Sequence, residues 1–156
     1  MRETERPDIL LVEDDPRDGE MTLRALERRS LVSEVVWVRD GALALLAIFG
    51  RNPSPDGALA MRPRMILLDL KLPKLGGLDV LRALKAHPVA RSIPVVVLSS
   101  SSEEGAELES YRLGVNSYIV KPTDFGRFCE TVSQLGLYWL LLNESPGRRL
   151  PGNVDR

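Results

Sequence analysis

Five short apolar segments, rich in β-branched residues, recur along the chain. Their lengths and their composition are typical of strands buried inside a sheet. Polar or turn-forming residues separate each segment from the next. The five predicted strands are Ile9–Val12, Val35–Val38, Met65–Leu68, Val95–Leu98 and Tyr118–Val120.

Between the predicted strands, apolar residues recur at the spacing of amphipathic helices. One such segment contains Leu78, Leu81 and Leu84, and another extends over Glu103–Leu113. Strands and helices therefore alternate as five βα units. This order predicts a doubly wound α/β fold, because parallel strands need crossover connections that place helices on both faces of the sheet. The clearest helical stripe consists of Ala42, Leu45, Leu46 and Phe49, at positions i, i+3, i+4 and i+7.

Turn-forming residues support these boundaries and reveal one long connection. Asp15-Pro16 is a helix N-cap followed by proline at the first helical position, and Gly114 suits the end of a later helix. Residues 50–64 contain three prolines and one further glycine, at position 57, so they predict a surface insertion before the third strand. We expect one domain over residues 1–143, followed by an arm or tail over residues 144–156.

The last predicted helix, residues 124–143, has more apolar surface than one sheet can cover. Its inward stripe includes Phe128 and Val132, yet from 137 to 142 apolar residues occupy every face. A symmetric partner would cover this excess, so we expect a homodimer through the last helix. The alternative is that residues 50–64 or 144–156 fold back over it. The exposed dimer residues would be Tyr138, Leu140 and Leu141.

Composition narrows the class of protein. The chain has 156 residues, 44% of them hydrophobic and 28% charged, which is ordinary for one folded domain. The net charge of -1 gives no general basic field for nucleic acid or an anionic membrane. No apolar run approaches the length of a membrane span, and the charged N-terminus lacks the pattern of a secretory signal. One cysteine, Cys129, and one histidine, His87, exclude cysteine or histidine metal clusters, and a reducing cytoplasm fits best.

Chemistry-bearing residues follow the strands at their carboxyl ends. Glu13-Asp14 follow the first strand, Asp69 the third, Ser99 the fourth and Lys121 the fifth. In a doubly wound sheet, ligands bind at this edge. Single acidic residues after strands are often helix caps or turn formers, but this combination favours a functional site.

The residue types point to phosphoryl chemistry with a divalent cation. Crowded carboxylates raise one another's pKa or capture a hard cation, and Mg²⁺ prefers oxygen ligands such as those of Asp14 and Asp69. A carboxylate can also attack phosphorus and form an aspartyl phosphate, for which the central Asp69 is the candidate. Lys121 could neutralise one phosphoryl oxygen, and the Ser99 hydroxyl could bond another.

The motifs resemble those of bacterial two-component response-regulator receiver domains over about residues 8 to 143. The matching segments are Leu-Val-Glu13-Asp14-Asp15, Leu-Leu-Asp69-Leu-Lys-Leu-Pro73 with Gly76-Gly77, Val-Leu-Ser99-Ser100 and Tyr118-Ile-Val-Lys121-Pro122. The resemblance implies a flavodoxin-like (βα)5 fold with strand order 2-1-3-4-5. The tail after Asn143 is too short for a DNA-binding module, so we expect no output domain and signalling by protein contacts.

The resemblance further implies a role for each matching residue. Asp69 matches the phosphoacceptor, which receives its phosphoryl group from a sensor histidine kinase. Ser99 and Tyr118 match the switch pair, and Lys121 matches the lysine that contacts the phosphoryl group. Residues 50–64 and the Tyr-Trp-Leu sequence near the end are similar to small single-domain regulators that pair with phytochrome-type kinases. The metal site would comprise Glu13, Asp14, Asp69 and the main-chain carbonyl of Lys71.

Three other classes share parts of this pattern. A flavodoxin-like flavin carrier would need a phosphate-binding loop where the chain has Glu13-Asp14-Asp15, whose charge would repel the anion. A degenerate receiver would act as an unphosphorylated binding module, yet every matched position keeps its functional group. A phosphatase acting on outside substrates would need a substrate cap. We therefore expect that the protein is not an enzyme and catalyses only its own phosphorylation and dephosphorylation.

Overall fold

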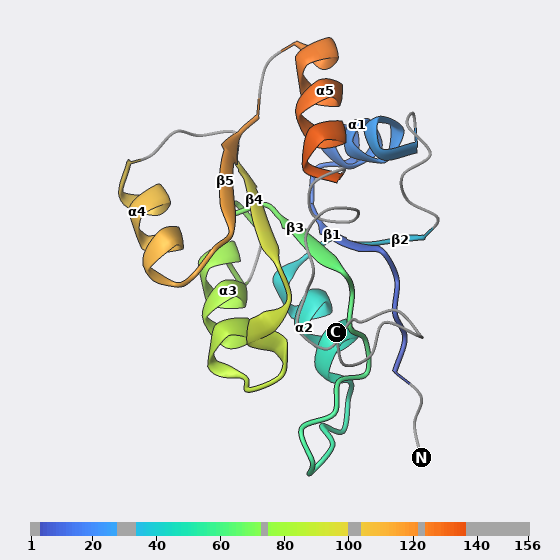
Figure 1. Cartoon of the computed structure of the whole chain (residues 1–156), viewed down its shortest axis with the longest axis vertical. Helices are drawn as coiled ribbons and strands as arrows, with labels where there is room; N and C mark the ends of the chain where they lie inside the picture. Colours follow the sequence, from blue (N-terminus) through green and yellow to red (C-terminus); the bar gives the residue numbers. More distant parts are fainter. Residues whose placement is uncertain (1–3, 28–33, 73–74, 100–103, 122–123, 137–156) are drawn as a thin grey trace, which may run out of the picture.

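A computed structural model describes residues 4–27, 34–72, 75–99, 104–121 and 124–136 of the chain (Figure 1). Within these residues the strands form one parallel five-stranded sheet in the order β2-β1-β3-β4-β5. The predicted flavodoxin-like strand order is confirmed. The strands are β1 (Ile9–Val12), β2 (Val35–Val38), β3 (Met65–Leu68), β4 (Val95–Ser99) and β5 (Ser117–Val120).

The first three strands have the predicted bounds, and the last two are each one residue longer. The ladder between β4 and β5 pairs Val96 with Ser117 and Ser99 with Val120, so pairing draws both serines into strands. The β-branched pattern missed them because serine carries no strand signal of its own.

Helices cover both faces of the sheet, as the alternation predicted (Figure 1). α1 and α5 pack together on one face, while α2 and α3 lie on the other. α4 lies beside α3 and β5, at one end of the sheet. The helices are α1 (Pro16–Glu27), α2 (Gly41–Phe49), α3 (Gly77–Ala86), α4 (Glu104–Arg112) and α5 (Phe125–Gly136), with a short 3-10 turn at Ala90–Ser92.

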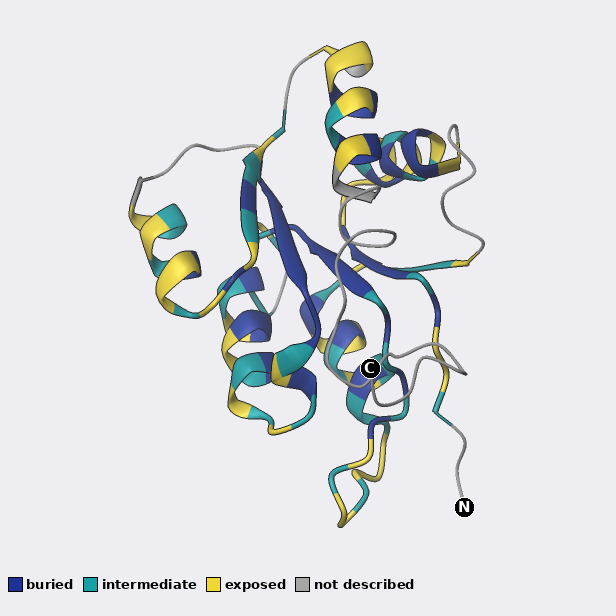
Figure 2. Cartoon of the chain, in the orientation of Figure 1, coloured by how far each residue is buried: buried dark blue, intermediate teal, exposed yellow. Residues whose placement is uncertain are grey.

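The three central strands are buried on both faces (Figure 2). Leu10 and Val12 point into the core beneath α2 and α3, whereas Ile9 and Leu11 belong to the core beneath α1 and α5. This alternation explains why the strands read as continuous apolar runs. Each fully buried large side chain contributes on the order of 1.5–3 kcal/mol of hydrophobic stabilisation. The carboxyl ends of β1, β3 and β4, where the predicted site residues lie, are therefore held by a rigid core.

Helix α2 forms where the pattern predicted it, but its buried face differs from the predicted stripe. The inward residues are Gly41, Ala44 and Ile48, whereas Leu46 of the stripe is 41% exposed. The segment is apolar on all sides, so spacing alone could not select a face. Its orientation comes instead from the Asp40 side-chain cap and from Gly41, where a Cβ would lie 2.4 Å from the carbonyl oxygen of Leu75.

The segment of residues 50–64 connects α2 to β3 and is only partly a surface loop. Its first half is mostly exposed, but Leu59 and Met61 are buried in the core beneath α2 and α3. Met61 also forms an isolated parallel bridge with Glu5. Alternate apolar residues therefore dock the second half of the segment against the domain.

Helix α5 places Phe128 and Val132 in the core, as its inward stripe predicted. Cys129 is buried beside them. The predicted helix continues to residue 143, but the end of that segment lies outside the described residues. The same applies to the predicted dimer residues Tyr138, Leu140 and Leu141 and to the arm 144–156. No helix in the described part of the chain is long and apolar enough to cross a membrane.

Candidate functional site

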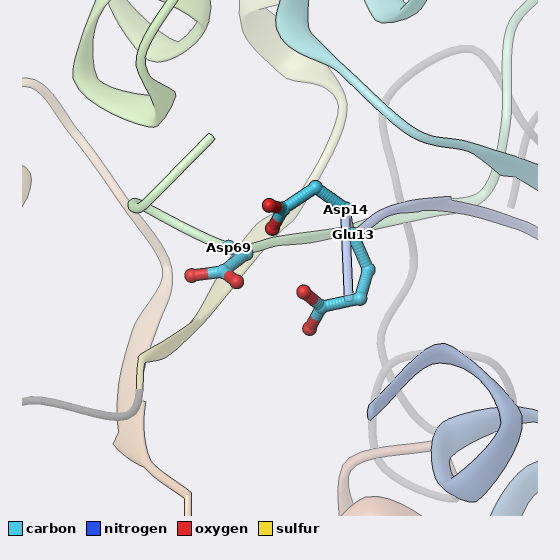
Figure 3. Close-up of side chains that lie close together, drawn as sticks. All are labelled: Glu13, Asp14 and Asp69. Carbon is cyan, nitrogen blue, oxygen red and sulfur yellow. The ribbon is translucent and has the colours of Figure 1, made fainter. Parts of the chain in front are cut away.

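The residues predicted from the sequence meet at the carboxyl edge of the sheet. Carboxylate oxygens of Glu13, Asp14 and Asp69 all lie within 4.8 Å of one another (Figure 3). Ser99 closes β4 beside them, and Lys121 reaches the same edge from the end of β5. Parallel register explains the convergence, because β1 and β3 pair Val12 with Leu68 and so end side by side.

Backbone hydrogen bonds fix the two buried acids at the ends of their strands. The amide of Asp69 donates to the carbonyl of Val12 at 3.0 Å, and the amide of Glu13 donates to that of Val38 at 3.1 Å. Glu13 is 2% exposed and Asp69 is 7% exposed, whereas Asp14 is exposed. The site therefore has a rigid inner wall and one acid open to solvent.

The turn after β3 holds the Asp69 side chain in place. The Lys71 amide donates to Asp69 Oδ1 at 3.1 Å, while the Lys71 side chain is exposed. Gly77 closes this turn by donating its amide to the carbonyl of Leu70 at 3.1 Å. A Cβ at Gly77 would lie 2.4 Å from the Asp69 carbonyl oxygen, so glycine is required for this close approach.

Trp37 on β2 supports Glu13 from behind. Its indole Nε1 donates to the main-chain oxygen of Glu13 at 2.8 Å. Gly19 on α1 packs against the ring so closely that a Cβ there would lie 2.0 Å from it. The Arg39 guanidinium lies 4.8 Å from the ring centroid. Trp37 thus connects α1 and β2 to the acidic edge, the carboxyl edge of the sheet that carries Glu13, Asp14 and Asp69.

Lys121 binds three acids at once. Its Nζ lies 2.5 Å from Glu13 Oε1, 2.9 Å from Asp18 Oδ2 and 3.5 Å from Asp69 Oδ2. The lysine side chain is only 7% exposed. Sequence reasoning missed Asp18, although its place in the first helical turn after Asp15-Pro16 could have located it at this edge.

Burial, hydrogen bonds and nearby charges shift the pKa of both Glu13 and Lys121. Burial and the hydrogen bond to Asp69 raise the pKa of Glu13 to about 8, against the lowering influence of Lys121. Burial alone would lower the pKa of Lys121, but hydrogen bonds to Asp18 and Glu13 and the nearby negative charges raise it above its usual range. The Lys121 ammonium group is therefore charged at neutral pH.

A cavity lies beside Asp69, between the turn after β3 and α4. Its volume is about 320 Å³, and its walls include Lys71, Gly77, Ser99 and Tyr118. Ser99 and Tyr118 are both buried. The two residues predicted as a switch pair therefore line one space next to the acidic edge.

The acidic edge has the donor set of a site for a hard divalent cation. Three carboxylates approach one another closely, and only oxygen atoms are offered. Mg²⁺ and Mn²⁺ both accept such ligands, with Mg²⁺ keeping several waters. The exposed position of Asp14 leaves room for those waters. The residues therefore fit a bound divalent metal.

The fold and this edge define the class of protein. In doubly wound domains ligands bind at the carboxyl ends of the strands, and phosphoryl transfer depends on groups there that position the reactants and offset charge. The family profile of the response regulator receiver domain matches residues 9–133. The chain belongs to the response regulator receiver family, and the alternative of a flavin carrier is wrong. Membership implies a histidine kinase as partner.

Particular relatives cover nearly the whole chain. The probable methanogenesis regulatory protein FilR2 of Methanothrix harundinacea is 40% identical over 89% of this chain and 87% of the relative. The solved structure of RcpA, a phosphorylated cyanobacterial phytochrome response regulator, is 38% identical, with a TM-score of 0.79, over 92% of this chain and 99% of that chain.

A third relative carries a metal. Response regulator Rcp1 of Synechocystis is 36% identical over 85% of this chain and 88% of its own length. Its Mn²⁺-bound structure superposes with a TM-score of 0.77, covering 90% of this chain and 99% of that chain. Metal binding at an acidic pocket is thus a property of the family to which this chain belongs.

Proposed function

We propose that the chain accepts a phosphoryl group on Asp69 from the phosphohistidine of a sensor kinase and signals through protein contacts. One observation carries the proposal: an Asp69 carboxylate oxygen lies within 4.8 Å of carboxylate oxygens of two further acids, and Asp69 Oδ2 lies 3.5 Å from the ammonium group of Lys121. A carboxylate in that position can attack phosphorus while positive charge nearby offsets the charge of the phosphoryl oxygens.

The transfer exchanges one bond to phosphorus for another. An Asp69 carboxylate oxygen forms a bond to phosphorus, the bond from phosphorus to the histidine nitrogen breaks, and the electron pair stays on that nitrogen. When bound by Glu13, Asp14, Asp69 and the Lys71 carbonyl, Mg²⁺ supplies positive charge that offsets repulsion between Asp69 and the phosphoryl group. Lys121 donates to one phosphoryl oxygen, and Ser99 to another. Water later hydrolyses the acyl phosphate, which releases inorganic phosphate and returns the Asp69 carboxylate.

Incubation with acetyl phosphate and Mg²⁺, followed by intact mass measurement, tests the function. A working acceptor gains the mass of one phosphoryl group, and it does so only with a divalent metal. A chain that gains no mass under these conditions would instead be a degenerate receiver that acts as a binding module.

Asp14 is expected to carry much of the metal affinity, because it is the exposed acid of the cluster. Millimolar Mg²⁺ should raise the melting temperature of the wild type, since a ligand at 100 times its Kd stabilises by about 2.7 kcal/mol. In Asp14→Ala the rise should largely disappear, and labelling should slow severely. Differential scanning calorimetry measures the effect, with the exposed Glu20→Ala on α1 as control. An equal Mg²⁺ shift in both variants would contradict this assignment.

Ser99 and Tyr118 are proposed to carry the signal away from the site. Phosphoryl oxygens would draw the Ser99 hydroxyl inward, which would let the Tyr118 ring turn into the adjoining cavity. The surface of α4, β5 and α5 would then change between two states. Support comes from the burial of both side chains along one cavity wall.

A phytochrome-type histidine kinase is the proposed partner, and the cytoplasm is the proposed location. The support is the likeness to RcpA, which is described as a phytochrome response regulator, over nearly the whole chain. A cytoplasmic kinase domain would meet the chain there. Phosphotransfer from a purified phytochrome kinase that exceeds transfer from an unrelated kinase would support this pairing.

A homodimer through the last helix remains a further proposal. Phe128 and Val132 face the core of the domain, so the continuing apolar sequence needs other cover. Tyr138, Leu140 and Leu141 would supply the interface. The wild type should sediment as a dimer at micromolar concentration, and Tyr138→Glu/Leu141→Glu should sediment as a monomer. A wild type that stays monomeric with and without phosphorylation would refute the dimer.

A further inference from the structure

The ammonium group of Lys121 lies at unequal distances from the carboxylates of its three acidic partners. Its contacts to Glu13 Oε1 at 2.5 Å and Asp18 Oδ2 at 2.9 Å are shorter than the 3.5 Å to Asp69 Oδ2. A lysine has three N–H donors, so three carboxylates can engage all of them. The two shortest contacts are to acids other than the acceptor.

Asp18 differs from the other two partners of Lys121. It comes from the first turn of α1 rather than from a strand end, and it is not one of the three clustered carboxylates. Its side chain is 28% exposed, whereas that of Glu13 is 2% exposed. None of the roles proposed above for the residues of the site involves Asp18.

Helix α1 holds Asp18 in a fixed place. Asp15 Oδ1 accepts from the amides of Arg17 and Asp18 at 2.8 and 3.3 Å, which fixes the start of the helix. One turn on, the close packing of Gly19 against Trp37 leaves α1 no freedom to move toward β2. The backbone that carries Asp18 is therefore held in place beside Lys121.

We propose that Asp18 is a positioning residue that keeps the Lys121 ammonium group directed at the phosphoryl site. Glu13 belongs both to the metal cluster and to the contacts of Lys121, so its carboxylate cannot serve both partners fully. Asp18 lies outside the cluster and retains its contact when a metal draws on Glu13. The inference rests on the proposed role of Asp69 as acceptor.

Removing the Asp18 carboxylate should slow phosphorylation of Asp69. With saturating Mg²⁺ and acetyl phosphate, Asp18→Ala should label about tenfold more slowly, as expected for loss of one charge-assisted hydrogen bond. Asp18→Asn should fall between Asp18→Ala and the wild type, because its amide oxygen still accepts a hydrogen bond. The rate is read by intact mass, and Glu20→Ala on the same helix is the matched control.

A double-mutant cycle separates positioning from a structural role. In a Lys121→Met background, Asp18→Ala should cause no further loss of rate, because the group that Asp18 positions is gone. In metal-free protein, the ¹³Cε resonance of Lys121 should shift in Asp18→Ala and stay unchanged in Glu20→Ala. Denaturant unfolding of each variant verifies its fold, and Asp18→Asn preserves the test if Asp18→Ala does not fold.

The outcomes distinguish this inference from the proposed function. If the wild type gains no phosphoryl group, the acceptor role fails and the positioning role falls with it. If the wild type labels but Asp18→Ala labels equally fast or faster, only the positioning role is overturned. Losses that multiply in the double variant would likewise make Asp18 a structural residue only.

Discussion

Asp69→Asn should abolish phosphorylation of the chain while leaving the domain folded. The amide cannot supply the nucleophilic oxygen that forms the bond to phosphorus. The substitution also removes one negative charge from a crowded cluster, so the metal-free protein should unfold at equal or higher denaturant concentration. Lys121 keeps its shorter contacts to Glu13 and Asp18. Intact mass after incubation with acetyl phosphate and Mg²⁺ measures the first effect.

A nearby acid supplies the control for this experiment. Asp15→Asn removes the same charge from an exposed position at the same edge, and its amide oxygen can still cap α1. It should label at close to the wild-type rate. Undiminished labelling of Asp69→Asn, or acid-stable phosphate on Ser99, would show that Asp69 is not the acceptor.

Gly77→Ala should both destabilise the domain and slow phosphorylation. The new Cβ would lie 2.4 Å from the Asp69 carbonyl oxygen and 2.6 Å from the Leu70 Cα. Both are backbone atoms, so the turn that carries the acceptor must move. We expect a loss of about 1–3 kcal/mol in the free energy of unfolding, as for other overpacked sites. The displaced carboxylate should react at least about tenfold more slowly.

A second glycine separates this steric effect from the general effect of an added methyl group. Among the described residues, and apart from the backbone of its own helix, no atom lies within 4 Å of a Cβ built at the exposed Gly105 on α4. Gly105→Ala should keep the wild-type labelling rate and should gain up to about 1 kcal/mol of stability from helix propensity. Guanidinium unfolding and intact mass compare the variants. Equal behaviour of the two alanine variants would refute the close-approach argument.

The sequence predicted the sheet well because its central strands are buried on both faces. Such strands must be continuously apolar, so β1 and β3 could be located to the residue. The positions of Glu13, Asp69 and Lys121 then followed from the rule that ligand groups gather at the carboxyl edge. Their order along the sheet came from the resemblance to receiver domains, since periodicity carries no information on strand neighbours.

Other features depend on tertiary contacts that periodicity does not contain. The buried face of α2 is selected by the Asp40 cap and the close approach of Gly41, not by the spacing of its leucines. Asp18 and Trp37 reach the site through the packing of α1 against β2. Each looked like an ordinary surface acid or strand aromatic in the sequence.

The bond between Glu13 and Lys121 links the first strand to the last, across 108 positions of the chain. During synthesis Glu13 and the acceptor Asp69 both emerge from the ribosome before Lys121 does, so an unfinished chain has the acceptor without its counter-charge. Closing so long a loop is entropically costly and follows only once the whole sheet has assembled. An incomplete or unfolded copy should therefore be a poor phosphoryl acceptor.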